Sequence, residues 1–322
     1  MSLPLRVLML LSTLVLFGGA PKVVAQEIQP RYRFEVGQVL RYRLSEEQTI
    51  RNSLMPGEQS QKMDRVYRFT VLAWDADART ATLEVRTESM RIETTGGPVK
   101  EVYDSSSSNN DARSPTTKMN DAMLEQKIRI TLSDRGDIIA FRGIDVESIL
   151  QEAFGDAASN QFFQMQLEEI RQSLSDENMR TVFQRMFIQL PATELSPKDE
   201  WQQSIEMTLP VFGPMKVDTN YTYVGVERKD GARQAQIRFD RSFERGQPGK
   251  ISPGGIELSI ENLTCTGNGL VSFAVDEGRI QRMTLMRTET GTLKPAVEQP
   301  GGMGAATVEA KTRSTLELLG DG

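Results

Sequence analysis

The side chains that could do chemistry in this 322-residue sequence are carboxylates, because it has no histidine and a single cysteine, Cys265. Paired Asp and Glu residues can hydrolyse glycosidic bonds without histidine. Close pairs occur at Asp75 with Asp77, Glu168 with Glu169, and Asp276 with Glu277. The first and third pairs fall in predicted hairpin turns, where Asp is favoured for backbone reasons, and the second lies beside an apolar helical stripe. The sequence therefore predicts structural roles for all three pairs and no catalytic residue.

Other catalytic classes are excluded by the residues that are missing. Without histidine and with one thiol, the chain has no Ser-His-Asp or Cys-His site and no zinc site of the His or Cys₄ type. The motifs S-x-x-K and G-x-S-x-G are absent, as are the phosphate-binding G-x-G-x-x-G and Walker sequences. We therefore expect a non-enzymatic protein without a metal or a cofactor. A carboxylate-dependent hydrolase ranks third, well behind the binding and structural functions described below.

An apolar stripe in the middle of the chain is the candidate site for a ligand. Its residues recur at the i, i+3, i+4 spacing of a helix. Met and Phe side chains can repack around irregular ligands, but a helix also buries such a face against a sheet as ordinary core. Both interpretations, a ligand site and ordinary core, stay open. The candidate ligand-binding residues are Phe163, Leu167, Met179, Phe183, Met186 and Phe187.

Three of the arginines and the cysteine can each be interpreted in two ways, as ordinary structural residues or as functional ones. Arg41, Arg43 and Arg68 fall on polar faces of early strands, where they form either a solvated face or a contact to an anionic surface such as lipid headgroups or a wall polymer. Cys265 is expected to be a buried, inert thiol, with intermolecular pairing as the alternative. The 38 basic and 44 acidic residues exclude the basic footprint that nucleic-acid binding needs.

Period-two alternation of apolar and polar residues predicts antiparallel strands over most of the chain. It is clearest in residues 40–44, 67–73, 81–85 and 128–132. The side chains expected to face the core in the first hairpin are Tyr67, Phe69, Val71, Leu83 and Val85. A tight hairpin of residues 31–36 on residues 39–44 would mix the two faces, so 31–36 is predicted to be a lead-in or to carry a bulge at Gly37.

Residues 145–190 have a helical period instead, and Ser175 or Asp176 can cap the last helix before Pro191 ends the segment. Residues 104–118 are small and polar and are predicted to form a loop.

The strand pattern also recurs along the chain. Three elements of the first half, at 37–44, 66–85 and 128–141, match 198–205, 220–239 and 269–286 in the same order. We therefore expect segments 66–85 and 219–239 to be equivalent hairpins.

The N-terminus reads as a secretory signal peptide. Arg6 precedes an uncharged apolar run at 7–17, and Val23-Val24-Ala25 is a small-residue cleavage site. The run is too short to span a membrane of about 30 Å. We therefore expect residues 1–25 to be removed and the mature chain, without a transmembrane segment, to lie in the periplasm or outside the cell.

Several stretches in order carry a resemblance: FEVGQVLRYRL, VYDSSSS, ITLSDRGDIIAFRGID, QLPATELSPKDEW, YTYVGVERKDGARQAQI and DEGRIQRMTL. With them the chain resembles a family of secreted bacterial proteins of planctomycete type and unknown function, over roughly residues 34–290. The resemblance implies no catalytic residue. The expected architecture is also similar to that of envelope carriers of lipoproteins and lipids, although fold does not imply function.

The sequence thus predicts a mainly β protein with a helical insertion: a curved antiparallel sheet of two similar halves with helices packed on one face. Residues 26–322 are expected to form a single domain, with a first β half at 26–144, a helical segment at 145–190 and a second β half at 191–322. The favoured function is binding or carrying an apolar or amphipathic ligand in the cell envelope. The alternative is a structural or protein-interaction module with a filled core.

Overall fold

Long antiparallel strands make up most of the protein. The computed structural model describes residues 23–53, 55–96, 100–111, 114–155, 164–209, 213–229, 231–245, 250–251, 258–295 and 305–321. The strands of the first half are β1 (Val23–Val24), β2 (Val39–Asn52), β3 (Met55–Asp75), β4 (Thr80–Thr95), β5 (Glu101–Asp104), β6 (Ile128–Ser133) and β7 (Ile138–Arg142). Those of the second half are β8 (Glu200–Leu209), β9 (Gly213–Lys229), β10 (Ala232–Arg245), β11 (Lys250–Ile251), β12 (Leu258–Ala274), β13 (Arg279–Pro295) and β14 (Ala306–Asp321).

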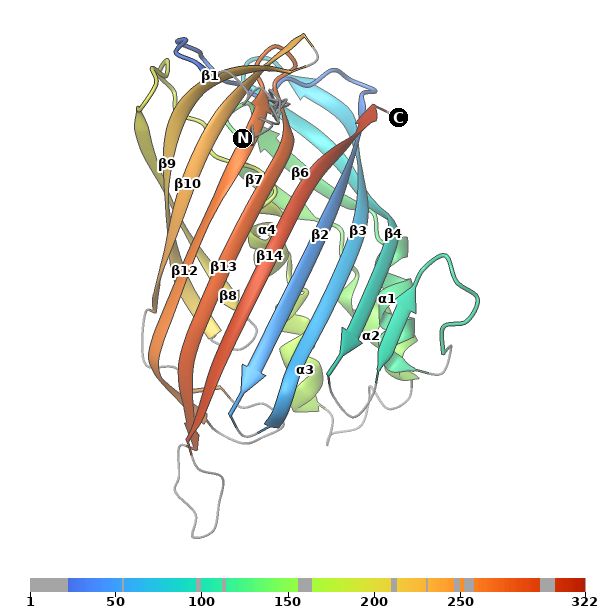
Figure 1. Ribbon diagram of the computed structural model, residues 1–322. Helices are drawn as coiled ribbons and strands as arrows, with labels where there is room; N and C mark the ends of the chain where they lie inside the picture. The colour runs from blue at the N-terminus through green and yellow to red at the C-terminus, as the bar shows by residue number, and fades with distance from the viewer. Residues whose placement is uncertain are drawn as a thin grey trace, which may run out of the picture.

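All of these strands belong to one curved sheet (Figure 1). Its path through the described residues is β1-β9-β10-β12-β13-β14-β2-β3-β4-β6-β7, with β5, β8 and β11 paired to β4, β9 and β12. The C-terminal strand β14 pairs with both β13 and β2 and so joins the two halves. The prediction of a mainly β protein built on a curved antiparallel sheet with helices on one face is confirmed.

The two halves follow the same strand order. The first runs β2-β3-β4-β6-β7 across the sheet, and the second runs β8-β9-β10-β12-β13. The predicted equivalent hairpins are β3–β4 and β9–β10. The recurring pattern in the sequence thus corresponds to a recurring strand order.

The inner face of the sheet carries the core. Alternate residues of β3 and β4 point inward and are almost fully buried, as their period of two requires. This confirms the prediction for Tyr67, Phe69, Val71, Leu83 and Val85, all of which belong to the main hydrophobic cluster. The same cluster includes inward residues of β9, β10 and β12, so both halves of the sheet share it.

Helices occupy the segment predicted for them. They are α2 (Val146–Phe154), α3 (Gln164–Ser173) and α4 (Asp176–Gln184), and Ser175 caps α4 by accepting from the backbone N–H of Asn178. The loop prediction for 104–118 is wrong at its end, because a further helix, α1 (Pro115–Glu125), begins there. A proline at the first helical position is compatible with a helix start, and α1 packs against α2 and β4.

Helix α4 spans the opening of the curved sheet. It contacts β7 at one edge and β8 at the other. The buried Gln184 side chain accepts from the Ile138 N–H and donates to the Gly136 carbonyl, both at 2.8 Å. On the other side, the Trp201 indole donates to the Gln189 carbonyl at 2.7 Å. The α4 region therefore fastens the two edges across the concave face.

The lead-in predicted at 31–36 is confirmed, since 25–38 forms no strand of the sheet. An isolated bridge joins Ile28 to Leu195, and backbone hydrogen bonds join Gly37 and Gln38 to Val71 of β3. The buried Tyr32 hydroxyl accepts from the Ile188 N–H at 3.0 Å and donates to the Ile188 carbonyl. Its ring contacts Phe187 and Phe273 edge-on. The lead-in thus fills the space between the sheet and the segment after α4.

The predicted signal peptide lies almost entirely outside the described residues. Strand β1, which pairs with Val226 and Glu227 of β9, precedes the predicted cleavage point after Ala25. Cleavage there would remove this strand. Among the helices of the described residues, none is long and apolar enough to cross a membrane.

Candidate functional site

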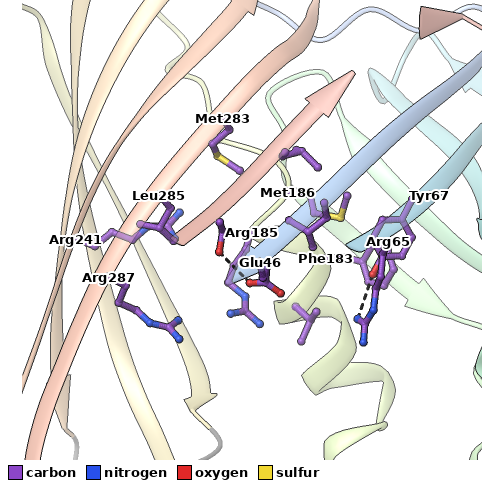
Figure 2. A pocket seen from close by; sticks show the side chains of 14 residues that line it. Glu46, Arg65, Tyr67, Phe183, Arg185, Met186, Arg241, Met283, Leu285 and Arg287 are labelled. Carbon is purple, nitrogen blue, oxygen red and sulfur yellow. Dashed lines mark hydrogen bonds between the residues drawn. The ribbon is translucent and has the colours of Figure 1, made fainter. Parts of the chain in front are cut away.

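A cavity remains between α4 and the concave face of the sheet (Figure 2). Its volume is about 80 Å³. Side chains from β2, β3, β10, β13 and β14 form the sheet side, and residues 182–186 form the helix side. The apolar lining includes Leu44, Val182, Phe183, Met186, Leu285 and Leu316. The cavity is thus bounded by the same face of the sheet that carries the core.

Strand register explains why these residues meet. Leu316 of β14 lies opposite Leu44 of β2, and Met283 of β13 lies opposite Leu316. Residues opposite each other in an antiparallel pair share a face of the sheet. One apolar row therefore runs across three strands that are far apart in sequence, and α4 brings Phe183 over it from the helical segment.

The cavity also has a polar side, which is made chiefly of arginines. Its charged lining residues are Glu46, Arg65, Arg185, Arg241 and Arg287. In the view of Figure 2, Arg185 lies between Arg65 on one side and Arg241 with Arg287 on the other. Glu46 accepts a hydrogen bond from the Ser314 hydroxyl at 3.0 Å. An apolar wall and a cationic wall therefore meet in one cavity.

Burial shifts the pKa values of charged groups in and beside this cavity. Burial, with the nearby guanidinium groups of Arg287 and Arg241, lowers the pKa of Arg185 to about 10. Arg185 still carries its charge at neutral pH. Burial also raises the pKa of the Glu289 carboxyl, against the influence of Arg287, with which it forms an ion pair at 2.5 Å. The cost of desolvating both partners is therefore only partly recovered by their attraction.

Of the six predicted ligand residues, Phe183 and Met186 line the cavity. Met179 and Phe187 are buried in the main core cluster beside it. Leu167 is also buried, but it lies outside this cluster, on helix α3, which contacts α2 and α4. Phe163 lies outside the described residues.

The predicted surface arginines lie on the opposite, outer face of the sheet. Arg43 and Arg68 are exposed, and Arg41 forms an ion pair with Glu88 at 2.6 Å. Cross-strand register places Arg41 opposite Arg68, and Arg68 opposite Arg86. These residues make a row of like charges on the outside and have no part in the cavity.

The carboxylate pairs occupy the structural positions expected of them. Asp75 accepts from the backbone N–H groups of Asp77 and Ala78 and so closes the β3–β4 turn. Asp276 pairs with Arg233 at 3.0 Å, and Glu277 pairs with Arg279 at 2.9 Å. The Glu168 side chain is exposed, and that of Glu169 lies outside the described residues.

Cys265 is buried and free, as the sequence predicted. It packs with Met215 and Val217 in a small second cluster, and burial raises the pKa of its thiol to about 12. Across the described residues, no group of three or more His, Cys, Asp or Glu side chains is placed to hold a metal ion.

The inward arginines were missed by the sequence analysis, although the pattern held a signal for them. Arg65 stands two residues before Tyr67, Arg241 two after Phe239, and Arg287 two after Leu285. At a period of two, each therefore shares the buried face of its strand. A charged residue on an apolar face is rare unless it is paired, and such residues are the ones to single out.

Comparisons with known proteins give a family and several distant structural likenesses, of which two are described below. A family model described as a family of unknown function (DUF6263) matches residues 78–280, well over half of the chain. No curated protein matches the chain.

Among solved structures, one of lipovitellin that concerns lipid–protein interactions is 13% identical, with a TM-score of 0.43. The alignment covers 90% of this chain and 26% of lipovitellin, so the chain spans about a quarter of that protein's length. The Pseudomonas aeruginosa protein OccK7 (OpdD) is 7% identical, with a TM-score of 0.19, over 89% of this chain and all of OccK7.

Proposed function

The chain belongs to the DUF6263 family of unknown function, and we propose that it binds an apolar or amphipathic ligand between α4 and the concave face of its sheet. The cavity lined by Phe183, Met186 and Leu285 is the observation that carries this proposal. The protein acts as a binding or carrier module rather than as an enzyme. The predicted signal peptide would direct it to the cell envelope.

Packing supports this site. Protein interiors are close-packed, and voids larger than a water molecule are few. Here a cavity of about 80 Å³ persists beside a core that is otherwise filled by large side chains such as Tyr67 and Phe69. Phe and Met on its helical wall are side chains that adapt to irregular ligands.

The size of the cavity defines how a ligand binds. Pockets for whole small molecules measure about 300–1,000 Å³, so 80 Å³ admits only part of an apolar chain. A larger ligand requires α4 to move outward from the sheet. In such a movement, the hydrogen bonds that hold this segment at the edges of the sheet, from Gln184 to β7 and from Trp201 of β8 to Gln189, would have to break or adjust.

The alternative, an interaction module that uses its outer surface, has its own support. The outer face carries the arginine row at Arg41 and Arg68 and exposes Leu72, Leu270 and Met286. Single exposed apolar residues are common on protein surfaces, so this face is a weaker candidate than the cavity. The two functions differ in whether an apolar probe enters beside α4.

The test is a titration with N-phenyl-1-naphthylamine, a neutral apolar dye whose fluorescence rises in an apolar site. Leu285→Trp, which fills the cavity from β13, should weaken dye binding at least tenfold. The matched control is Met286→Trp, because the neighbouring Met286 side chain is 55% exposed on the outer face. Val182→Trp fills the same space from α4 and should act like Leu285→Trp. Thermal unfolding of each variant confirms that it is folded.

Saturable binding by the wild type and by Met286→Trp, but not by the two filled variants, is the expected result. If the folded wild type does not bind the dye, or if the filled variants bind it as well as the wild type does, the cavity is not the site.

A further inference from the structure

Four arginine side chains line the cavity. Arg65 comes from β3, Arg241 from β10 and Arg287 from β13, and Arg185 follows the end of α4 (Figure 2). Distant parts of the chain are thus brought together to place four guanidinium groups beside the apolar lining.

Only part of the hydrogen-bonding capacity of these groups is used: Arg241 interacts with the Tyr221 hydroxyl, and Arg287 Nη2 donates to the Thr312 hydroxyl at 3.4 Å. The Nε atoms of Arg65 and Arg241 are buried and have no hydrogen-bond partner among the described residues. Arg65 makes one long contact, from Nη1 to the Tyr67 hydroxyl at 3.4 Å. Arg241 lies over the Phe239 ring, with its guanidinium carbon 4.9 Å from the ring centre. A buried donor without a partner is unfavourable for folding, so these two Nε–H groups are available to an acceptor on a ligand.

The positive charge is also not balanced. Within the described ranges, two carboxylates lie beside the four guanidinium groups: Glu289, paired to Arg287, and Glu46, which lines the cavity. If both are ionised, an excess of two positive charges remains.

Buried cations without counterions are stabilised by an anion from outside. Guanidinium groups present several N–H donors in a planar fork that matches the oxygens of a carboxylate or a phosphate. Several such forks around one space can hold one oxyanion. The apolar wall formed by Phe183, Met186 and Leu285 adjoins them within the same cavity.

We infer that the ligand is an anionic amphiphile, whose acidic headgroup is bound by Arg65, Arg185, Arg241 and Arg287 while its apolar chain lies against Phe183, Met186 and Leu285. The headgroup chemistry is that of an oxyacid: a phosphate, carboxylate or sulfate ester on an alkyl chain. This inference rests on the proposed function and adds the chemical class of the ligand to it.

The experiment compares amphiphiles with the same twelve-carbon chain and different headgroups, each below its critical micelle concentration. Dodecyl phosphate, dodecyl maltoside and dodecyltrimethylammonium are titrated against bound N-phenyl-1-naphthylamine. Inorganic phosphate alone is a further arm, which separates a free anion from a headgroup. The variants are Arg185→Gln and Arg241→Gln. Arg238→Gln is the matched control, since Arg238 is an exposed residue on the outer face of the same strand as Arg241.

Dodecyl phosphate should displace the dye from the wild type at a concentration at least about tenfold lower than the neutral amphiphile needs. This difference is expected for hydrogen bonds to charged groups. Arg185→Gln and Arg241→Gln should lose this preference while keeping the dye, and Arg238→Gln should retain it.

Dye binding without any preference for the anion, or a preference that survives both variants, would overturn this inference and leave the proposed function standing. Displacement of the dye by inorganic phosphate at the same concentrations as by dodecyl phosphate would also overturn it, because the anion would then need no tail. If the wild type does not bind the dye, both proposals are wrong.

Discussion

Phe183 belongs both to the core and to the wall of the cavity. Its ring contacts Tyr67 and Phe141 at centroid distances of 5.5 Å, and only 2% of the residue is exposed. One side of the ring borders the cavity, so that side already lacks packing partners. Its burial and its neighbours show a packing role, and its position makes it a contact for a ligand.

We expect Phe183→Ala to lower the free energy of unfolding by about 3 kcal/mol, the low end of the range for buried phenylalanines. The existing cavity reduces the loss, because fewer contacts are removed there. Denaturant unfolding measures the change, with Met286→Ala on the outer face as the control. A loss below about 1 kcal/mol would mean that Phe183 is not packed as described.

The arginines inside and outside the sheet differ in what surrounds them. Arg41 on the outer face has Glu88 beside it and solvent around it. Arg241 on the inner face has an aromatic ring below it and a buried Nε without a partner in the described part of the chain. The same residue type thus forms a solvated surface in one place and a candidate binding site in the other.

At the scale of elements, Gln184 joins α4 to the edge strand β7. Gln184→Leu leaves the Ile138 N–H and the Gly136 carbonyl without their side-chain partner in a buried position. We expect a loss of about 2–6 kcal/mol of stability, because each of the two groups costs about 1–3 kcal/mol. Hydrogen exchange at the Ile138 amide should accelerate more than at the central strands.

The control for this change is Gln172→Leu, at an exposed position of α3. Equal protection of the Ile138 amide in Gln184→Leu and in the wild type would show that α4 does not fasten β7.

Strand β12 is shaped by a glycine beneath an aromatic ring. A Cβ at Gly269 would lie 2.1 Å from the Thr284 carbonyl oxygen and 2.2 Å from Cζ of Phe239. The same atom at Gly267 would lie 3.2 Å or more from its neighbours. Gly269→Ala should therefore destabilise the protein by about 1–3 kcal/mol, as overpacking does, and Gly267→Ala by clearly less. Thermal unfolding of the two variants would contradict this account if their effects were equal.

At the scale of the whole molecule, buried weak acids make the fold sensitive to alkali. Burial raises the pKa of Tyr223 and of Cys265 to about 12, and it raises that of Tyr32 well above the ordinary value of 10. Above about pH 9 to 10 the unfolded chain releases protons that the folded state keeps, so the free energy of unfolding falls as pH rises. Burial also lowers the pKa values of Arg31, Arg185 and Arg241, and these groups act in the opposite sense.

Stability should thus be full below about pH 9 and decline through pH 11 as the unfolded state ionises. Urea unfolding at pH 8, 9.5 and 11 measures the decline. Tyr223→Phe, which removes one titrating group, should make the decline shallower. A free energy of unfolding that rises between pH 8 and 11 would contradict this account.

Much of the fold could be predicted because short-range periods report which side chains are buried. The period of two placed Tyr67 and Phe69 in the core, and the helical period placed Met179 and Phe183 there. These patterns depend only on neighbouring residues, which any one sequence contains. Helix α1 was not predicted from the sequence because its first turn is polar.

The charged wall of the cavity could not be predicted in the same way. Arg185, Arg241 and Arg287 meet only because distant strands pair in one register and α4 crosses the opening of the sheet. That pairing includes β14 with β2, which joins the two ends of the chain. Local periodicity carries no information on which strands become neighbours.

The most direct test of the central claim is native mass spectrometry of the protein purified without detergent from its own host cells. The account predicts one additional mass of lipid size per chain, released on unfolding, and absent from the Leu285→Trp variant prepared in the same way. A wild-type protein that carries no such mass, or a Leu285→Trp variant that carries it equally, would contradict the claim that the cavity beside α4 is a ligand site.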